Sequence, residues 1–248
     1  MKRSLQSRII EQILAMAGPK NDFDSQMNLA WQFDAYFKVD EKPYILPEII
    51  RKRFGILQIE SEGMDTYFLH GKHLPGQKHI LYLHGGGYVS QPLVLHWEFL
   101  RRLAHRLDAN ITVPIYPKAP YHHYKESFDK VLPVYGEMLT VADPADIIIM
   151  GDSAGGGFAL ALAQLLLENG IRQPSNIILI SPLLDITMSN PEIQELEKKD
   201  PLLSACAIVE AGKAYAGGTD PRHYMLSPIY GKIQGLGQIT IFVGTHEL

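Results

Sequence analysis

Residues 147–157 read IIIMGDSAGGG, and this stretch decides how the rest of the chain is interpreted. The apolar run at 147–150 is typical of a buried strand, and residues 159–167 have the apolar spacing of a helix. A G-x-S-x-G pattern between a strand and a helix describes a turn so tight that only glycine fits beside the serine. The sequence therefore predicts that the Ser153 hydroxyl lies at the C-terminal edge of a sheet, next to a helix N-terminus that stabilises negative charge.

A second glycine-rich segment follows another predicted strand. Residues 79–83 read HILYL and continue into HGGGY at 84–88. Three consecutive glycines weaken order unless a close approach requires them, and the N–H groups of such a segment can approach a substrate oxygen without hindrance from side chains. Together with the serine turn, this segment predicts an oxyanion hole. A flexible loop is the alternative for the glycines taken alone.

Alternating strand and helix patterns predict the α/β class. Strands are expected at 54–59, 66–70, 79–83, 111–116, 147–150, 177–180 and 239–243, and helices at 97–107, 124–139 and 157–167. This alternation favours a mostly parallel, doubly wound sheet with ligands at the C-terminal ends of its strands. Helical patterns at 5–14 and 24–37, and in a long insert at 201–209 and 214–216, lie outside that alternation. We expect one domain, 1–248.

The chain at this point resembles a known family. HGGG at 84–87 and GDSAGG at 151–156 look like the two signature motifs of the hormone-sensitive-lipase-like esterases, a branch of the α/β-hydrolases. The segment YPKAP at 116–120 is similar to the family's Tyr-Arg-Leu-Ala-Pro, with Pro117 and Lys118 as departures. The resemblance extends from residue 54 to the end of the chain. It implies the α/β-hydrolase fold, with a helical cap contributed by about 1–50 and 186–230.

The resemblance also implies a reaction and the residues that perform it. The family hydrolyses carboxylic esters through an acyl-enzyme, and its motifs assign the nucleophile to Ser153. The backbone N–H groups of Gly86, Gly87 and Ala154 would bind the oxyanion. The substrate would be a small-molecule ester with a short acyl chain, roughly acetyl to hexanoyl, in a pocket narrowed by the cap and by Tyr88. Simple core packing is the alternative for Tyr88.

The acid and the base follow the serine in this family. The acid comes after the strand at 239–243, where Glu247 matches its position, although most relatives have aspartate there. A carboxylate beyond Leu248 and an ordinary exposed glutamate are the alternatives for this role. The base should follow about 30 residues later, and none of the ten histidines lies in that order. We therefore expect the catalytic histidine, the last strand and the last helix to be absent, so that this chain hydrolyses esters poorly or not at all.

Two other functions remain open from the sequence. The serine turn specifies acyl transfer but not the leaving group, so an amide or another acyl donor is possible as substrate. A non-catalytic small-molecule binder, or an inactive fragment, would keep the glycine loop and lack the histidine. No cofactor or metal is expected, because a serine triad works with side chains alone.

Composition narrows the class of protein. The chain has 248 residues, is 46% hydrophobic and carries a net charge of −4, which is typical of a soluble enzyme with one large core. This mild acidity argues against a nucleic-acid partner. The single Cys206 excludes an internal disulfide and favours a cytoplasmic location. No apolar stretch is long enough to span a bilayer, and nothing in the sequence specifies an oligomeric state.

Overall fold

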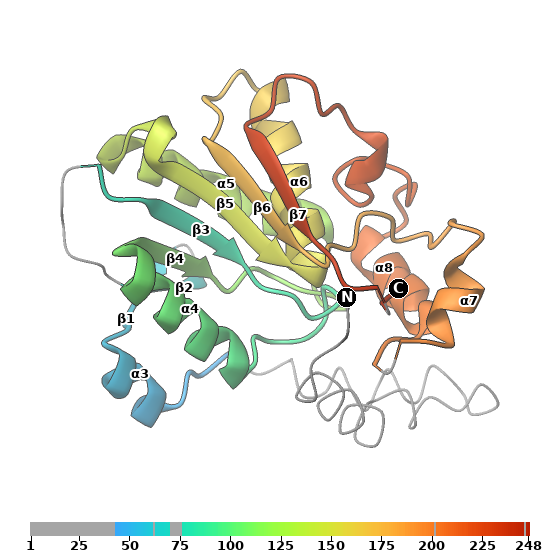
Figure 1. The fold of residues 1–248 in the computed structure, drawn as a ribbon, viewed down its shortest axis with the longest axis horizontal. Helices are drawn as coiled ribbons and strands as arrows, with labels where there is room; N and C mark the ends of the chain where they lie inside the picture. The colour runs from blue at the N-terminus through green and yellow to red at the C-terminus, as the bar shows by residue number, and fades with distance from the viewer. Residues whose placement is uncertain (1–42, 62, 70–75, 201, 246) are drawn as a thin grey trace.

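The computed structural model describes residues 43–61, 63–69, 76–200, 202–245 and 247–248 (Figure 1). The helices predicted at 5–14 and 24–37 lie outside the described residues. The described chain forms a seven-stranded sheet in the order β1-β2-β4-β3-β5-β6-β7. Its strands are β1 (Leu57–Ser61), β2 (Met64–Leu69), β3 (His79–Leu83), β4 (Asn110–Pro114), β5 (Ile147–Asp152), β6 (Asn176–Ile180) and β7 (Gln238–Phe242).

The sheet is mostly parallel, as predicted. β1 pairs with β2 and β2 pairs with β4 in the antiparallel sense, and the pairings from β4 through β3, β5 and β6 to β7 are parallel. The helices are α3 (Glu48–Phe54), α4 (Val94–Leu107), α5 (Tyr124–Val141), α6 (Ser153–Glu168), α7 (Ile193–Glu197) and α8 (Ala205–Ala216), with 3-10 turns η2 (Pro144–Asp146) and η3 (Pro228–Tyr230).

Side-chain alternation along the strands builds one core on each face of the sheet. In β3, Leu81 and Leu83 pack into the core that contains the buried residues of α5 and α6. Ile80 and Tyr82 point the other way and pack with Trp97 of α4. Because consecutive residues of a strand face opposite sides, a strand that is apolar throughout is buried on both faces. This two-sided burial confirms the doubly wound arrangement.

The direction of the chain connections reverses between β3 and β5. From β3 the chain passes through α4 to β4 on one side, and β5 pairs with the other side of β3. Ligands of such sheets bind where the connections diverge, beyond the carboxyl ends of the two strands. Leu83 is in register with Gly151, so both glycine motifs emerge side by side at this point. Figure 1 shows α7 and α8 (orange) on the side toward which the arrowheads of β3 and β5 point.

Several predicted boundaries are wrong. The strand predicted at 54–59 begins only at Leu57, because Phe54 is the last residue of α3, a helix that was not predicted. Gly55 ends this helix in the left-handed conformation, with a φ of 64°. The helices predicted at 201–209 and 214–216 are the single helix α8, and α7 precedes it. The helix predicted to begin at 157 begins at Ser153, because the chain turns from β5 into α6 within one residue.

The structure bears on the membrane expectation and leaves the domain expectation untested. The assignment of 1–248 to one domain, with a cap from about 1–50 and 186–230, stays a prediction. In the part of the chain that the structure describes, no helix has the length and apolar character needed to cross a bilayer. The cytoplasmic location also stays a prediction.

Candidate active site

Ser153 lies at the point where β5 becomes α6. β5 ends at Asp152 and α6 begins at Ser153 itself. The φ angle of Ser153 is 48°, in the left-handed region that strains a residue with a side chain. The first N–H groups of α6 have no partner within the helix and carry its positive dipole end. The serine hydroxyl is therefore presented next to a group of amide donors.

Close backbone contacts explain two of the glycines around the serine. A Cβ atom at Gly155 would overlap the carbonyl oxygens of Leu83 and His84, and one at Gly151 would overlap the carbonyl oxygen of Gly155. No side chain could move to relieve these overlaps, because the opposing atoms belong to the backbone. The turn at residues 151–155, which we call the elbow, is thus packed directly against the end of β3, where the glycine loop begins.

The glycine loop, residues 84–87, folds back on itself immediately after β3. Gly86 has a φ of 122°, and its carbonyl oxygen accepts hydrogen bonds from the N–H groups of Val89 and Ser90 at 3.0 and 2.8 Å. Gly87 also has a positive φ, 62°. Among the described residues, neither the N–H of Gly86 nor that of Gly87 has a hydrogen-bond acceptor. Two amide donors of the predicted oxyanion hole are thus available beside the elbow.

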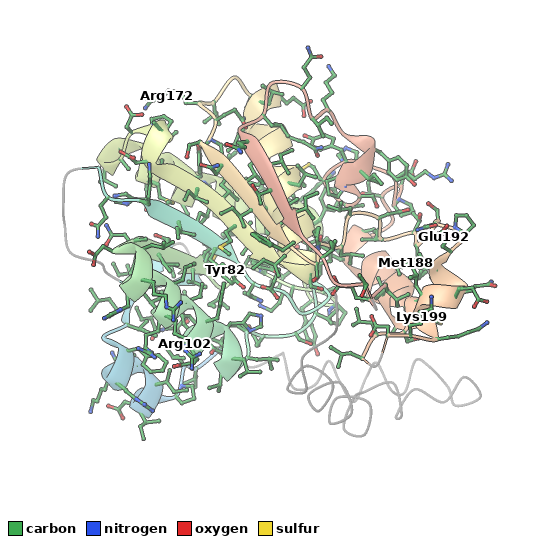
Figure 2. All side chains as sticks on the ribbon, viewed as in Figure 1. Tyr82, Arg102, Arg172, Met188, Glu192 and Lys199 are labelled. Atoms are coloured by element: carbon green, nitrogen blue, oxygen red, sulfur yellow. The ribbon has the colours of Figure 1, made fainter. Side chains whose placement is uncertain are left out.

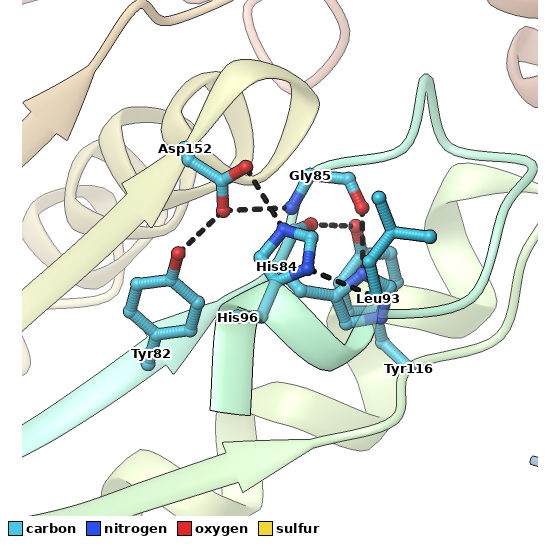
Figure 3. Close-up of polar contacts among 7 residues, drawn as sticks. All are labelled: Tyr82, His84, Gly85, Leu93, His96, Tyr116 and Asp152. Atoms are coloured by element: carbon cyan, nitrogen blue, oxygen red, sulfur yellow. Dashed lines mark hydrogen bonds and ion pairs between the residues drawn. The ribbon is translucent and has the colours of Figure 1, made fainter. Parts of the chain in front are cut away.

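Asp152 joins the elbow to the glycine loop (Figure 3). Its Oδ1 accepts hydrogen bonds from the Gly85 N–H at 2.9 Å and from the Tyr82 hydroxyl at 2.6 Å, and its Oδ2 lies 3.2 Å from Nε2 of His96. Nδ1 of His96 accepts from the N–H of Leu93 at 2.9 Å, so the ring proton must be on Nε2, which donates to the carboxylate. One carboxylate therefore ties β3, β5 and α4 together.

Burial and hydrogen bonding shift the pKa of the Asp152 carboxylate in opposite directions. Burial alone would raise the pKa of Asp152, but the hydrogen bond and electrostatic attraction of His96, followed by the hydrogen bonds from Tyr82 and Gly85, hold it below its ordinary value of 3.8. Burial and then the neighbouring carboxylate raise the pKa of Tyr82 well above its ordinary value of 10.0. At neutral pH the carboxylate is charged and the Tyr82 hydroxyl remains a donor.

His84 supports the glycine loop from inside the core. Its Nδ1 donates to the carbonyl oxygen of Gly85 at 2.7 Å, and its ring stacks on Tyr116 with 4.6 Å between the centroids. The Tyr116 hydroxyl donates to the His84 carbonyl at 2.6 Å. Burial, followed by the charge of Lys118, lowers the pKa of His84 to about 3. The imidazole is therefore neutral and structural at physiological pH.

Glu247 reaches the end of β6. Its Oε1 accepts hydrogen bonds from the Ser181 hydroxyl at 3.0 Å and from the N–H of Gly244. Ser181 follows β6 directly and has a φ of 43°. No histidine within the described residues contacts this carboxylate, and His246 lies outside them. The role of Glu247 as the acid stays a prediction.

Tyr88 is part of the core. Its ring is 1% exposed and stacks on Tyr215, with 4.2 Å between the centroids and 4° between the planes. Of the two interpretations of Tyr88, core packing therefore describes the ring. Its hydroxyl has no hydrogen-bond partner among the described residues and lies beside Gly157 of α6.

Sequence reasoning missed Tyr82, His96 and the role of Asp152. Tyr82 was hidden inside an apolar strand pattern, although a phenol in a buried strand normally needs a polar partner. His96 lies 56 residues before Asp152 in the chain, and no local pattern connects them. Asp152 lies inside the serine motif, and the need of its carboxylate for hydrogen-bond donors was the one available signal.

The polar atoms of the site are suited to acyl transfer. The described part offers a serine hydroxyl, unpaired amide donors and a carboxylate that three donors already occupy. No group of three His, Cys, Asp or Glu side chains that could hold a metal ion is found in the described ranges.

Comparison with known proteins connects this geometry to a family. The model of the family described as alpha/beta hydrolase fold matches residues 80–248. An esterase of Acinetobacter venetianus is 34% identical over 171 residues, which cover 68% of this chain and 56% of the relative. A candidate esterase structure from Staphylococcus aureus is 30% identical with a TM-score of 0.82, over 88% of this chain and 76% of that one. The structure of EstE7, a homologue of hormone-sensitive lipase from a metagenome library, is 26% identical with a TM-score of 0.77, over 100% and 80%. The chain spans 56–60% of the length of three curated relatives named esterase or acetyl-hydrolase.

Proposed function

Because the chain belongs to the α/β-hydrolase fold family, on its hormone-sensitive-lipase-like branch, we propose that it is a serine hydrolase of carboxylic esters. The observation that carries this proposal is the placement of Ser153. It is a serine with a positive φ between a strand and a helix, packed against a glycine loop that Asp152 anchors. Such an elbow presents a hydroxyl for attack on a carbonyl group while neighbouring amides bind the carbonyl oxygen.

The proposed reaction runs through an acyl-enzyme. Oγ of Ser153 attacks the carbonyl carbon of the ester and gives its proton to a base, and the carbonyl oxygen becomes an oxyanion. The proposed donors to that oxyanion are the N–H groups of Gly86, Gly87 and Ala154. The base then protonates the departing alcohol, and a water molecule hydrolyses the acyl-serine in the second half. Loss of one oxyanion donor typically lowers kcat by about 10²–10³.

The proposed base is a histidine that this chain does not contain. His96 uses Nδ1 to accept from Leu93 and Nε2 to donate to Asp152, so neither nitrogen can take a proton from Ser153 while these bonds persist. The pKa of His84 is lowered to about 3 by burial, which makes it a poor base at neutral pH. Glu247 is the proposed partner of the base, because a glutamate can orient an imidazole as an aspartate does.

A short-acyl ester is the proposed substrate class. The names of two relatives, esterase and acetyl-hydrolase, support it. The insert that carries α7 and α8 lies toward the C-terminal edge of the sheet, where it would restrict the space for the acyl chain. Assays on nitrophenyl esters of graded length would test this, and a preference for long-chain triglycerides would reject it.

The first experiment is nitrophenyl acetate hydrolysis by this chain and by a version extended to the natural stop codon. Each is compared with its Ser153→Ala variant and with Ser204→Ala, a control at the N-cap of α8 whose side chain makes no capping hydrogen bond. We expect turnover in the extended protein to disappear in Ser153→Ala and to persist in Ser204→Ala. This chain alone should be slower by about 10³ or more.

Two other outcomes discriminate among the alternatives. Equal rates in the two versions, both abolished by Ser153→Ala, would place the base within this chain. Absence of any Ser153-dependent turnover of esters, amides or other acyl donors in the extended protein would favour a non-catalytic small-molecule binder.

A further inference from the structure

The outward face of α4 combines exposed apolar and basic side chains. Trp97, Leu100 and Ala104 bury the inner side of this helix. On the opposite side, Leu95, Phe99, Arg102 and Arg106 follow one another at intervals of four, three and four residues, so they form one ridge. Leu95 is 77% exposed and Phe99 is 38% exposed. The apolar residues occupy the N-terminal half of the ridge and the arginines its C-terminal half.

A basic cavity lies on the C-terminal half of α4. Its volume is about 260 Å³, and it is lined by Arg101, Arg102, His105 and Arg106. Glu98 is the acid that approaches it, with hydrogen bonds from Arg101 at 2.9 and 3.1 Å and from Arg102 at 2.8 Å. Among the described residues, no carboxylate pairs with Arg106. α4 therefore carries three arginines and one glutamate.

The neighbouring helix α3 extends this positive charge. The guanidinium groups of Arg53 and Arg101 both lie over the ring of Phe54, at 5.8 and 5.2 Å from its centroid. Together α3 and α4 contain six lysines and arginines and two glutamates, in a chain whose net charge is −4. The chain as a whole is therefore acidic, whereas α3 and α4 together carry an excess of positive charge. Ile49 of α3, 78% exposed, adds an apolar side chain to it.

We propose that the outward face of α4 docks this protein on an anionic phospholipid surface. Phosphate groups would occupy the basic cavity, because guanidinium groups pair with phosphate oxygens in a bidentate manner. Leu95 and Phe99 would enter the boundary between head groups and acyl chains. A nucleic acid would satisfy the arginines but would leave these exposed apolar side chains in water, so the combination favours a lipid surface.

Docking in this orientation would hold the elbow near the lipid. His96, in the first turn of α4, donates to Asp152, the residue before Ser153. Arg102 and Arg106 are six and ten residues further along the helix, about 9 and 15 Å at 1.5 Å per residue. Within the proposed ester hydrolysis, docking would bring the enzyme to short-acyl esters held at a lipid surface. The docking itself requires no catalysis and is tested without it.

The test is flotation of the protein with vesicles. Vesicles of phosphatidylcholine with 30% phosphatidylglycerol are compared with pure phosphatidylcholine, at low and high NaCl. We expect binding to the anionic vesicles alone, weakened by salt. The variant R101Q/R102Q/R106Q should bind about a hundredfold more weakly, since each basic residue near an anionic surface accounts for about a fivefold change in affinity. R172Q/K199Q/K232Q, which removes three exposed charges outside α4, is the matched control and should bind as the parent does. Figure 2 labels Arg172 and Lys199, both at a distance from α4.

A second variant distinguishes a loss of vesicle binding from a loss of folding, because it is expected to bind more tightly. Glu98→Gln removes the acid from the cavity and leaves its arginines, so it should bind anionic vesicles about fivefold more tightly. Leu95→Ser should weaken the binding that survives at high salt. Equal loss in the α4 variant and the control, or no gain in Glu98→Gln, would overturn the proposal. So would release from vesicles by pyrophosphate at matched ionic strength, which indicates a soluble phosphate ligand, or binding to duplex DNA with the same dependence on the arginines.

Discussion

Replacement of Asp152 by asparagine is expected to lower the free energy of unfolding by about 3 kcal/mol at pH 7. The carboxylate accepts hydrogen bonds from Tyr82, Gly85 and His96. Asparagine keeps one oxygen, which can still serve two donors, but its amide nitrogen then faces Nε2–H of His96. Because the Leu93 N–H holds His96 in this tautomer, two donors meet and one hydrogen bond is lost.

The size of this loss in unfolding free energy follows from the charge of the Asp152 carboxylate, which accepts the three hydrogen bonds. A hydrogen bond to a charged group contributes about 1.5–3 kcal/mol, and one to a neutral group about half of that. The variant loses one such bond and weakens two. The lower end of the range applies, because the Asp152 side chain is 24% exposed and the His96 distance is 3.2 Å.

The difference in unfolding free energy between the parent and Asp152→Asn should depend on pH in one direction. Since the folded state lowers the pKa of Asp152, its stabilisation is present above the ordinary value of 3.8 and is lost as the pH falls through the folded pKa below it. The difference between parent and variant should therefore be constant from about pH 8 to 5, and it should shrink only below about pH 4.

Urea unfolding followed by circular dichroism at pH 8, 7 and 5 measures this difference. Glu98→Gln, at a partly exposed ion pair on α4, is the control and should stay within about 0.5 kcal/mol of the parent. In the extended protein, Asp152→Asn should also lower kcat by about 10–100-fold with little change in KM, because the glycine loop loses its anchor. A loss of stability below about 1 kcal/mol would refute the view that this carboxylate holds the loop to the elbow.

Further substitutions test the turn, the glycines and the buried histidine. Ser153→Gly should exceed Ser153→Ala in unfolding free energy by about 0.5–1 kcal/mol, because only glycine adopts the φ of 48° without strain; equal thermal melts would contradict this. Gly155→Ala should destabilise by about 3 kcal/mol through overlap with carbonyl oxygens, whereas Gly136→Ala in α5, where a Cβ meets open space, should stabilise by about 0.5–1 kcal/mol in the same denaturation assay. The unfolded state binds a proton at His84 near pH 6.5 and the folded state only near pH 3, so stability should fall by about 2 kcal/mol from pH 7 to 5. His84→Phe, which keeps a ring against Tyr116, should remove that decline.

The sheet could be predicted because its strands carry their own signal. β3, β5 and β6 carry apolar residues on both faces, and β7 carries isoleucines on one face; each strand fell within about two residues of its predicted range. Helix α3 was missed because a seven-residue helix has too few turns for apolar periodicity. Its remaining signals were available: an acid in the first turn, basic residues in the last, and Gly55 after the end.

The candidate site could be predicted only where its residues are contiguous in sequence, and their catalytic roles stay a prediction. Ser153 and Ala154 lie in one motif, and Gly86 and Gly87 in another, and the register of β3 with β5 brings the motifs together. The contact network around Asp152 depends on which face of β3 Tyr82 occupies and on where α4 begins. Both are properties of the packed structure, so neither could be read from local pattern.

The three donors around Asp152 also resolve an electrostatic conflict in the proposed mechanism. A carboxylate one residue from the nucleophile would repel a developing oxyanion. Hydrogen bonds from Tyr82, His96 and the Gly85 N–H disperse its charge, and they also consume the amide of the first glycine. The N–H groups of the second and third glycines have no acceptor among the described residues. The carboxylate that anchors the loop therefore also selects which of its amides face a substrate, which is why the first glycine is not a proposed donor to the oxyanion.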